Sequence, residues 1–175
     1  MGVLCALGLL ATTALPAYAD DGPRLVPVSR GGRQEAPAQP QSTNPPAAPE
    51  LGLGDRIADR AIAFIGSPYT WGGASPVTGF DCSGFVQWVL GQFGLDSGRV
   101  VWAQYQHGRP VPADQLQPGD IVFFANTYTS GLSHVGIYVG DGQFVDAGTE
   151  RTGVRRASLG DPYWAARFVG ARRIR

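Results

Sequence analysis

Apolar residues recur at helical spacing in two stretches of the first half of the chain. In Leu53–Ile65 they follow one another every three or four positions, with charged residues between them, and Gly66 and Pro68 then interrupt the pattern. A second apolar stripe begins just after Cys82 and closes at Gly94. The pattern predicts an amphipathic packing helix followed by a helix whose body is buried and whose first residue is a cysteine.

The second half of the chain has the shorter apolar runs that are typical of strands. Three of them, separated by turn-forming residues, cover Ile121–Phe124, His134–Val139 and Gln143–Ala147. Because the helices come first and the strands follow, the order predicts an α+β domain with an antiparallel sheet. The stretch Arg99–Gly108 between the two halves is predicted to be a connecting loop.

The hairpin between the last two of these strands decides where two polar side chains lie. A two-residue turn would place His134 and Asp146 on opposite faces of the sheet, because side chains alternate along a strand. A three-residue loop, Gly140–Gly142, with a left-handed glycine in a G1 bulge puts both on one face. Asp146 would then oppose Gly136, whose missing side chain leaves room for a diagonal contact with His134.

The N-terminal 50 residues differ from the rest of the chain. Met1–Ala19 has a short apolar run and then Ala-Tyr-Ala, which predicts a secretory signal peptide cleaved after Ala19. The apolar run is too short for a membrane span, so we expect no stable membrane insertion after cleavage. Residues 20–50 are rich in Pro, Ala and Gln and are predicted to be a disordered linker, or a segment that folds back over the domain. Residues 51–175 then form one domain.

Charge and cysteine usage narrow the possible chemistry. The 14 basic and 14 acidic residues balance, so the sequence predicts no nucleic-acid partner. Two histidines and no paired ligand spacing predict no metal site and no cofactor. Removal of Cys5 with the signal peptide leaves Cys82 without a disulfide partner. It follows Asp81, a good N-cap, where helix N–H groups stabilise a thiolate. The alternative is a buried structural cysteine.

Three further polar residues are candidates with more than one interpretation. Tyr69, in the glycine-rich turn before Cys82, is either a core aromatic or the source of an active-site hydroxyl. Arg99 either meets a substrate carboxylate or faces water. His107, in the predicted connecting loop, is expected to be structural or solvated rather than a general base.

Three motifs in this order resemble the NlpC-type bacterial cell-wall cysteine peptidases. They are Asp81–Gly84, Leu116–Phe124 and Ser133–Gly140, and the similarity extends from Leu51 to Ile174. The resemblance implies a papain-like α+β fold with a nucleophile helix packed on a central antiparallel sheet. It also implies a secreted, cell-wall-associated monomer that cleaves peptidoglycan stem peptides, commonly between D-glutamate and the diamino acid.

The same resemblance assigns roles to individual residues. Cys82 is then the nucleophile, His134 the base, and Asp146 the third polar residue, a position where many members have a second histidine. A carboxylate there can accept the ring N–H and stabilise the imidazolium. The resemblance also implies four substrate-binding positions: Tyr69, Asp81, Ser83 and Ser133. Arg99 and Gln104 match a weaker family pattern without an assigned role.

Two other functions use the same residues and stay open as alternatives. One is a catalytically silent module that only binds peptidoglycan, against which the intact Cys82 and His134 argue. The other is a different thiol acyl-transfer enzyme on the same fold, such as an amidase or a transpeptidase.

Overall fold

Both predicted helices are present in the computed structural model, which describes residues 51–175. α1 (Leu53–Ile62) ends three residues before the predicted boundary. α2 (Cys82–Gly91) begins at the predicted residue, where the Asp81 carboxylate accepts a hydrogen bond of 2.7 Å from the Gly84 N–H. The predicted signal peptide (1–19) and linker (20–50) lie outside the described residues.

The other elements are short. They are β1 (Ala74–Ser75), β2 (Gly79–Phe80), α3 (Val101–Gln106), β3 (Arg109–Val111), the 3-10 turn η1 (Ala113–Gln115), β4 (Ile121–Ala125), β5 (Leu132–Gly140), β6 (Gln143–Ala147), β7 (Val154–Ser158), α4 (Pro162–Ala165) and β8 (Phe168–Arg173). The three predicted strands correspond to β4, β5 and β6, whereas the predicted connecting loop contains α3. Within residues 51–175, no helix is both long enough and apolar enough to cross a membrane.

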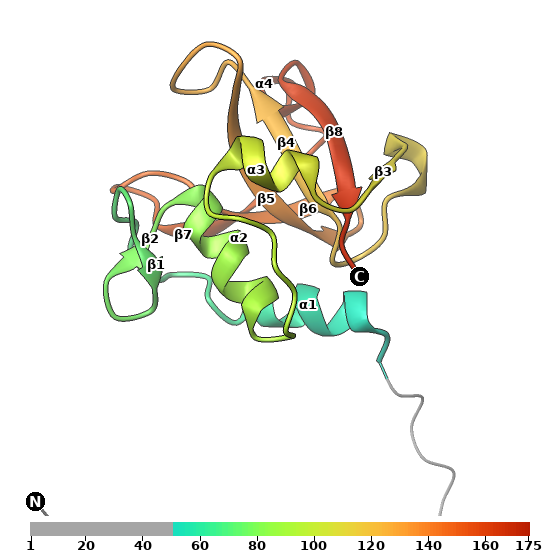
Figure 1. Cartoon of the computed structure of the whole chain (residues 1–175). Helices are drawn as coiled ribbons and strands as arrows, with labels where there is room; N and C mark the ends of the chain where they lie inside the picture. Colours follow the sequence, from blue (N-terminus) through green and yellow to red (C-terminus); the bar gives the residue numbers. More distant parts are fainter. Residues whose placement is uncertain (1–50) are drawn as a thin grey trace, which may run out of the picture. The chain divides into compact units, whose positions relative to one another are not determined.

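Six of the strands form one antiparallel sheet in the order β3-β8-β4-β5-β6-β7 (Figure 1). The last strand of the chain, β8, therefore inserts between β3 and β4 instead of joining the edge beside β7. β1 and β2 form a separate hairpin just before α2. The arrangement confirms the predicted α+β class.

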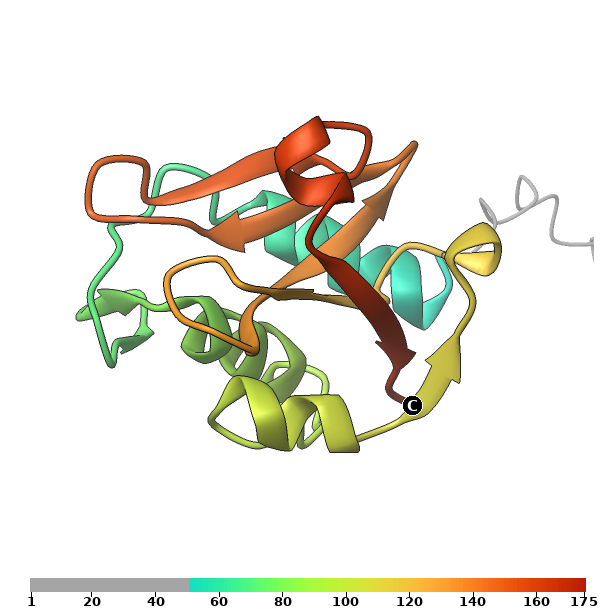
Figure 2. The same cartoon turned by 90° about the horizontal axis from the view of Figure 1, so that it is seen from above.

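The two faces of the sheet carry different helices. Ile121 and Phe123 of β4 point to the face that packs on α1 and α2. The alternate residues, Val122 and Phe124, point to the opposite face, where Trp164 of α4 covers them. Figure 2 shows α4 on one side of the sheet and the longer helices on the other. Because both faces of the sheet are buried here, β4 is a continuous apolar run without alternating polar residues.

The β5–β6 turn differs from the predicted three-residue loop. Gly140 pairs with Gln143, so only Asp141 and Gly142 lie between the strands. Both have positive φ, 52° and 69°, as a type I′ turn requires. Asp-Gly favours that turn strongly enough to set the loop length, so the three-residue prediction was wrong.

The register of this hairpin is nevertheless the predicted one, because a bulge in β5 supplies the missing residue. The pairing shifts between Tyr138 and Gly140, which makes Val139 the extra residue. Upstream of the bulge Ile137 pairs with Val145. The offset places His134 and Asp146 on the same face of the sheet.

Candidate active site

Cys82 occupies the first position of α2 and opens on a groove of about 500 Å³. Its side chain is mostly buried, with 6% of the residue exposed, and it is the free cysteine of the described residues. The groove is also lined by Tyr69, Arg99 and Tyr128. At a helix start the first N–H groups lack intrahelical partners, so they and the helix dipole favour negative charge on the sulfur and on a nearby oxyanion.

The carboxylate of Asp81 holds the start of α2 in place. Arg99 donates to both of its oxygens, Nη2 to Oδ2 at 2.8 Å and Nη1 to Oδ1 at 3.0 Å. The N–H groups of Gly72 and Gly84 donate to the same carboxylate at 3.0 and 2.7 Å. Arg99 also donates to the Ser83 hydroxyl at 3.0 Å. Asp81 and Ser83 line the groove as predicted, but their polar atoms are already engaged, and direct substrate contacts stay a prediction.

Arg99 pairs with Asp81, a contact that neither of its two interpretations included. Its side chain is 35% exposed and lines the groove, so contact with a substrate carboxylate stays a prediction. The hydrogen bond to Asp81 is the main reason why the pKa of Arg99 is raised. Since Arg99 comes from the segment before α3, the ion pair fastens that segment to the start of α2.

His134 and Asp146 meet on the sheet face, as the register predicts. His134 Nε2 and Asp146 Oδ2 are 2.7 Å apart, with Asp146 fully buried and 5% of His134 exposed. Because Nε2 faces the carboxylate, the other ring nitrogen is left for Cys82, which is among the groups that raise the pKa of His134. Burial by itself lowers the pKa of His134, but the hydrogen bonds to Asp146 and then Cys82, with the charges of both, raise it to about 9.

Aromatic side chains fix the plane of the imidazole. Trp164 stacks on the His134 ring, with 5.3 Å between centroids and 25° between planes. Phe124, which pairs with His134 across β4 and β5, lies 6.2 Å away. The ring is therefore held by packing on its face and by the hydrogen bond at Nε2, so little orientational freedom has to be lost when it reacts.

Tyr69 stands at the rim of the groove as a protonated hydroxyl. Its pKa is raised to about 12, first by burial and then by the charges of Cys82, Asp81, Glu150 and Tyr128. The hydroxyl therefore stays protonated, and able to donate a hydrogen bond, at neutral and moderately alkaline pH.

Ser133 does not line the groove, contrary to the prediction. It is the extra residue of a bulge, because Leu132 pairs with Ala125 and His134 with Phe124. Its buried hydroxyl accepts from the Thr127 N–H at 3.0 Å and lies 2.9 Å from the Thr127 hydroxyl. The bulge turns Ser133 toward the β4–β5 loop, where it fixes the loop.

The two remaining polar candidates are structural. His107 Nδ1 donates to the Ala103 carbonyl at 2.7 Å, a contact that fits the expected structural role. Gln104 is fully buried and donates to the Ser83 carbonyl at 2.8 Å, tying α3 to α2. Among residues 51–175 no group of three His, Cys, Asp or Glu side chains is placed to hold a metal ion.

Several residues of the site were missed by the sequence prediction. Trp71, Trp102 and Tyr128 line the groove and are 69%, 64% and 58% exposed. Trp164 packs on His134, as described above. The sequence offered one signal for these groove residues: they are large aromatics that belong to no periodic apolar pattern. Such side chains, when exposed, often mark a binding surface.

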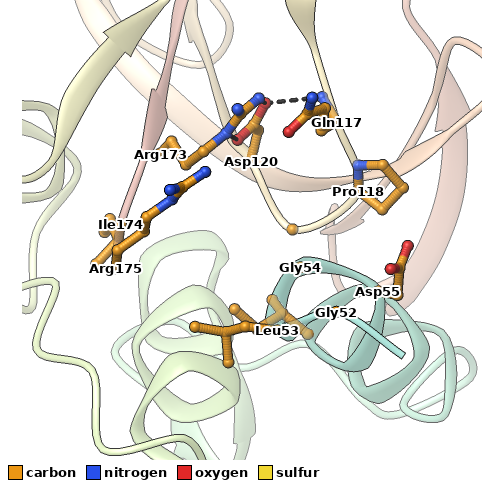
Figure 3. Close-up of a pocket in the computed structure, with 12 residues that line it drawn as sticks. Gly52, Leu53, Gly54, Asp55, Gln117, Pro118, Asp120, Arg173, Ile174 and Arg175 are labelled. Atoms are coloured by element: carbon orange, nitrogen blue, oxygen red, sulfur yellow. Dashed lines mark hydrogen bonds and ion pairs between the residues drawn. The ribbon is translucent and has the colours of Figure 1, made fainter. Parts of the chain in front are cut away.

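A second cavity, of about 550 Å³, is lined by the start of α1, the turn before β4 and the last residues of the chain (Figure 3). On its wall Arg173 donates to both oxygens of the buried Asp120, at 2.6 and 2.7 Å, and the Gln117 N–H donates to one of them at 2.8 Å. These bonds tie β8 to the turn before β4. The cavity contains none of the predicted site residues, so it is not the candidate active site.

Comparison with known proteins identifies the family. Residues 66–173 match the NlpC/P60 family. The chain belongs to that family. It is 40% identical over 119 residues to a gamma-DL-glutamyl hydrolase and 38% identical over 124 residues to the bifunctional muramidase/DL-endopeptidase CwlT, both of Bacillus subtilis strain 168. These matches cover 67% and 69% of the chain but 29% and 36% of the two relatives. The chain thus spans about a third of their length.

Solved structures agree with the family. The NlpC/p60 domain of the peptidoglycan hydrolase SagA matches with a TM-score of 0.60 and 34% identity, over 70% of this chain and 99% of that one. An NlpC/P60 family protein of Bacillus cereus matches with a TM-score of 0.65 and 32% identity, over 71% and 41% of the two chains. The predicted family and papain-like α+β fold are therefore confirmed.

Proposed function

We propose that the protein is a secreted cysteine endopeptidase that cleaves stem peptides of peptidoglycan. The observation that carries this proposal is the 2.7 Å contact between His134 Nε2 and Asp146 Oδ2, together with Cys82 at the start of α2 on the groove. We call these three residues the relay. A thiol, an imidazole and a carboxylate in this order are the parts of nucleophilic acyl transfer. Relatives that include a bifunctional muramidase/DL-endopeptidase and a probable peptidoglycan endopeptidase, LytE, support the substrate.

The first half of the reaction forms a thioester. His134 takes the proton of the Cys82 thiol, and the raised pKa of the imidazole, about 9, favours the resulting ion pair at neutral pH. The thiolate attacks the amide carbon, and its electron pair forms the S–C bond while the carbonyl electrons move to oxygen. The Cys82 N–H at the helix start and the Tyr69 hydroxyl are the proposed donors to this oxyanion.

The second half releases both products. As the C–N bond breaks, the imidazolium gives its proton to the leaving amine, so the amine departs neutral. Neutral His134 then takes a proton from water, whose oxygen attacks the thioester carbon and displaces the Cys82 thiolate. Asp146 stays ionised throughout and stabilises each imidazolium that forms.

Which bond is cleaved belongs to the proposal as well. The D-glutamate–diamino acid bond is supported by relatives named for DL or gamma-DL-glutamyl cleavage. The stem peptide lies outside the cytoplasm, so secretion through the predicted signal peptide, Met1–Ala19, is the matching location. We propose that the mature enzyme acts as a monomer on the cell wall.

Digestion of purified muropeptides tests this function. The full chain should release two stem-peptide fragments, identified by mass spectrometry, and Cys82→Ala should release none. His107→Gln is the matched control, because it changes the other histidine of the chain, which only bonds Ala103. Binding of muropeptides without cleavage would favour a silent module instead, and release of an intact stem from the sugar would favour an amidase.

A further inference from the structure

Asp146 has one oxygen that the proposed relay does not use. Oδ2 faces His134, but Oδ1 is buried and has no hydrogen-bond partner among the described residues. Asp146 itself is fully buried. A carboxylate oxygen removed from water without a donor destabilises the charged form, so a compensating group is expected near Oδ1.

Arg155 is the group that lies there. It faces Asp146 directly across the β6–β7 pairing, and β7 is the edge strand beside β6 (Figure 1). Arg155 Nε is 3.4 Å from Asp146 Oδ1, and within the described residues this nitrogen is likewise buried without a hydrogen bond. Two buried atoms that lack partners, one cationic and one anionic, therefore face each other.

The surroundings leave room for the guanidinium at this position. A Cβ on Gly148 would lie 2.9 Å from Arg155 Nε and 3.4 Å from its Cζ, so any larger residue would crowd the Arg155 side chain. Trp164, which stacks on His134, also has Arg155 Cζ over its ring at 5.8 Å. Arg155 thus touches both groups that fix the imidazole, the carboxylate at one edge and the indole at its face.

We infer that Arg155 is a positioning residue of the relay, which holds the Asp146 carboxylate turned so that Oδ2 faces His134. This inference rests on the proposed function for its kinetic consequences. Its physical basis is that the side chain of Arg155, 39% exposed, keeps its charge in contact with water while its Nε reaches the buried carboxylate. The ion pair therefore lacks the full desolvation cost of two buried charges.

Substitution of Arg155 in the full chain tests the inference. Arg155→Met removes the charge at similar length and should lower kcat on muropeptides about fivefold, with KM unchanged, because a half-exposed pair contributes modestly. Arg155→Lys keeps the charge and should retain about half of the activity or more. Arg156→Met is the matched control, since Arg156 is exposed, adjacent on β7 and directed to the other face of the sheet.

A double-mutant cycle separates positioning from a general structural effect. In an Asp146→Asn background, Arg155→Met should change the rate by less than about 1.5-fold, because the partner charge is already gone. The rate at which iodoacetamide alkylates Cys82, measured by mass spectrometry of the peptide that contains it, should show the same pattern among the variants. This measurement needs no substrate turnover. Equal losses for the Met and Lys variants, or an undiminished loss in the Asn background, would overturn the inference. If alkylation of Cys82 shows this pattern but the unmutated protein cleaves no muropeptide, only the proposed function is overturned.

Discussion

His134 Nε2 and Asp146 Oδ2 lie 2.7 Å apart, although the two residues are 12 positions apart in the chain and belong to different strands. Neither residue is more than 5% exposed, so water hardly competes for this hydrogen bond. The carboxylate orients the ring, leaving its other nitrogen for Cys82. Ring orientation and ring charge therefore depend on one buried contact.

Asp146→Asn should abolish most of the activity. The amide has nearly the same shape but no charge, so it stabilises neither the imidazolium nor the required tautomer, and kcat should fall about 100-fold or more. Asp141→Asn is the matched control, because Asp141 is exposed in the β5–β6 turn and asparagine tolerates its positive φ of 52°. Steady-state kinetics on muropeptides measures both, and full activity of Asp146→Asn would remove Asp146 from the relay.

The raised pKa of His134 predicts a particular dependence on pH. Its value rises from 6.5 to about 9 on folding, so protonation contributes stability that is fully present below pH 6.5 and is lost as the pH rises through about 9. Activity should fall over the same alkaline range, because the imidazolium that donates to the leaving amine disappears.

NMR titration of the ring protons checks this value directly, since the chain has only two histidines. Cys82→Ala should lower the midpoint of His134 below about 9, because Cys82 is one of the groups that raise it. A midpoint near 6.5 in the unmutated protein would contradict the ion pair. His107, which lies away from the relay, can be assigned through its Gln variant.

Local signals were enough to predict that a helix begins at Cys82, and strand alternation was enough to predict that His134 and Asp146 meet. Asp81 directly precedes an apolar helical stripe, and as the N-cap it accepts a hydrogen bond from Gly84, three residues later, which fixes the first turn of α2. Alternation fixes the faces of His134 and Asp146 once the offset of the hairpin is known. That offset was predicted correctly but for the wrong reason, because the extra residue is Val139 in the strand and not a third loop residue.

The residues around His134 could not be predicted in the same way. Arg155 belongs to a strand in which two arginines follow one another, so the sequence shows no alternation that would identify the face of either side chain. Its pairing with Asp146 depends on the length of the β6–β7 loop, which the sequence does not determine. Trp164 reaches the imidazole from a helix of four residues, too short for any periodic signal. Ser133 does not line the groove because a bulge turns it toward the β4–β5 loop, and sequence patterns do not reveal such bulges.

Gly136 is predicted to be essential to the geometry of the relay. A Cβ there would lie 2.7 Å from Phe144 Cδ2, 2.9 Å from the Val145 carbonyl oxygen and 3.4 Å from Asp146 Cβ. Gly136→Ala should therefore push β5 and β6 apart, lowering the free energy of unfolding by about 1–3 kcal/mol. Activity should fall further than stability accounts for, because Asp146 moves relative to His134.

Gly91→Ala is the control for this substitution. Gly91 is the last residue of α2, and an added Cβ there meets nothing within 4 Å, so alanine should be neutral or slightly stabilising. Thermal unfolding and kcat/KM of the two variants separate packing from helix propensity. Equal behaviour of Gly136→Ala and Gly91→Ala would show that β5 and β6 accommodate the methyl group without cost.

Arg99→Lys should weaken the start of α2, the helix that begins at Cys82. Arg99 donates to both oxygens of Asp81 and to the Ser83 hydroxyl, a fork geometry that an ammonium group cannot reproduce. Because the Arg99 side chain is 35% exposed, the loss of stability should be small, about 0.5–1 kcal/mol. The loss in kcat/KM should be larger, since Asp81 fixes the turn that carries Cys82. Arg109→Lys, at an exposed position on β3, should change neither quantity, and an Arg99→Lys enzyme with unchanged kcat/KM would show that the Asp81 pairing is not needed to place the thiol.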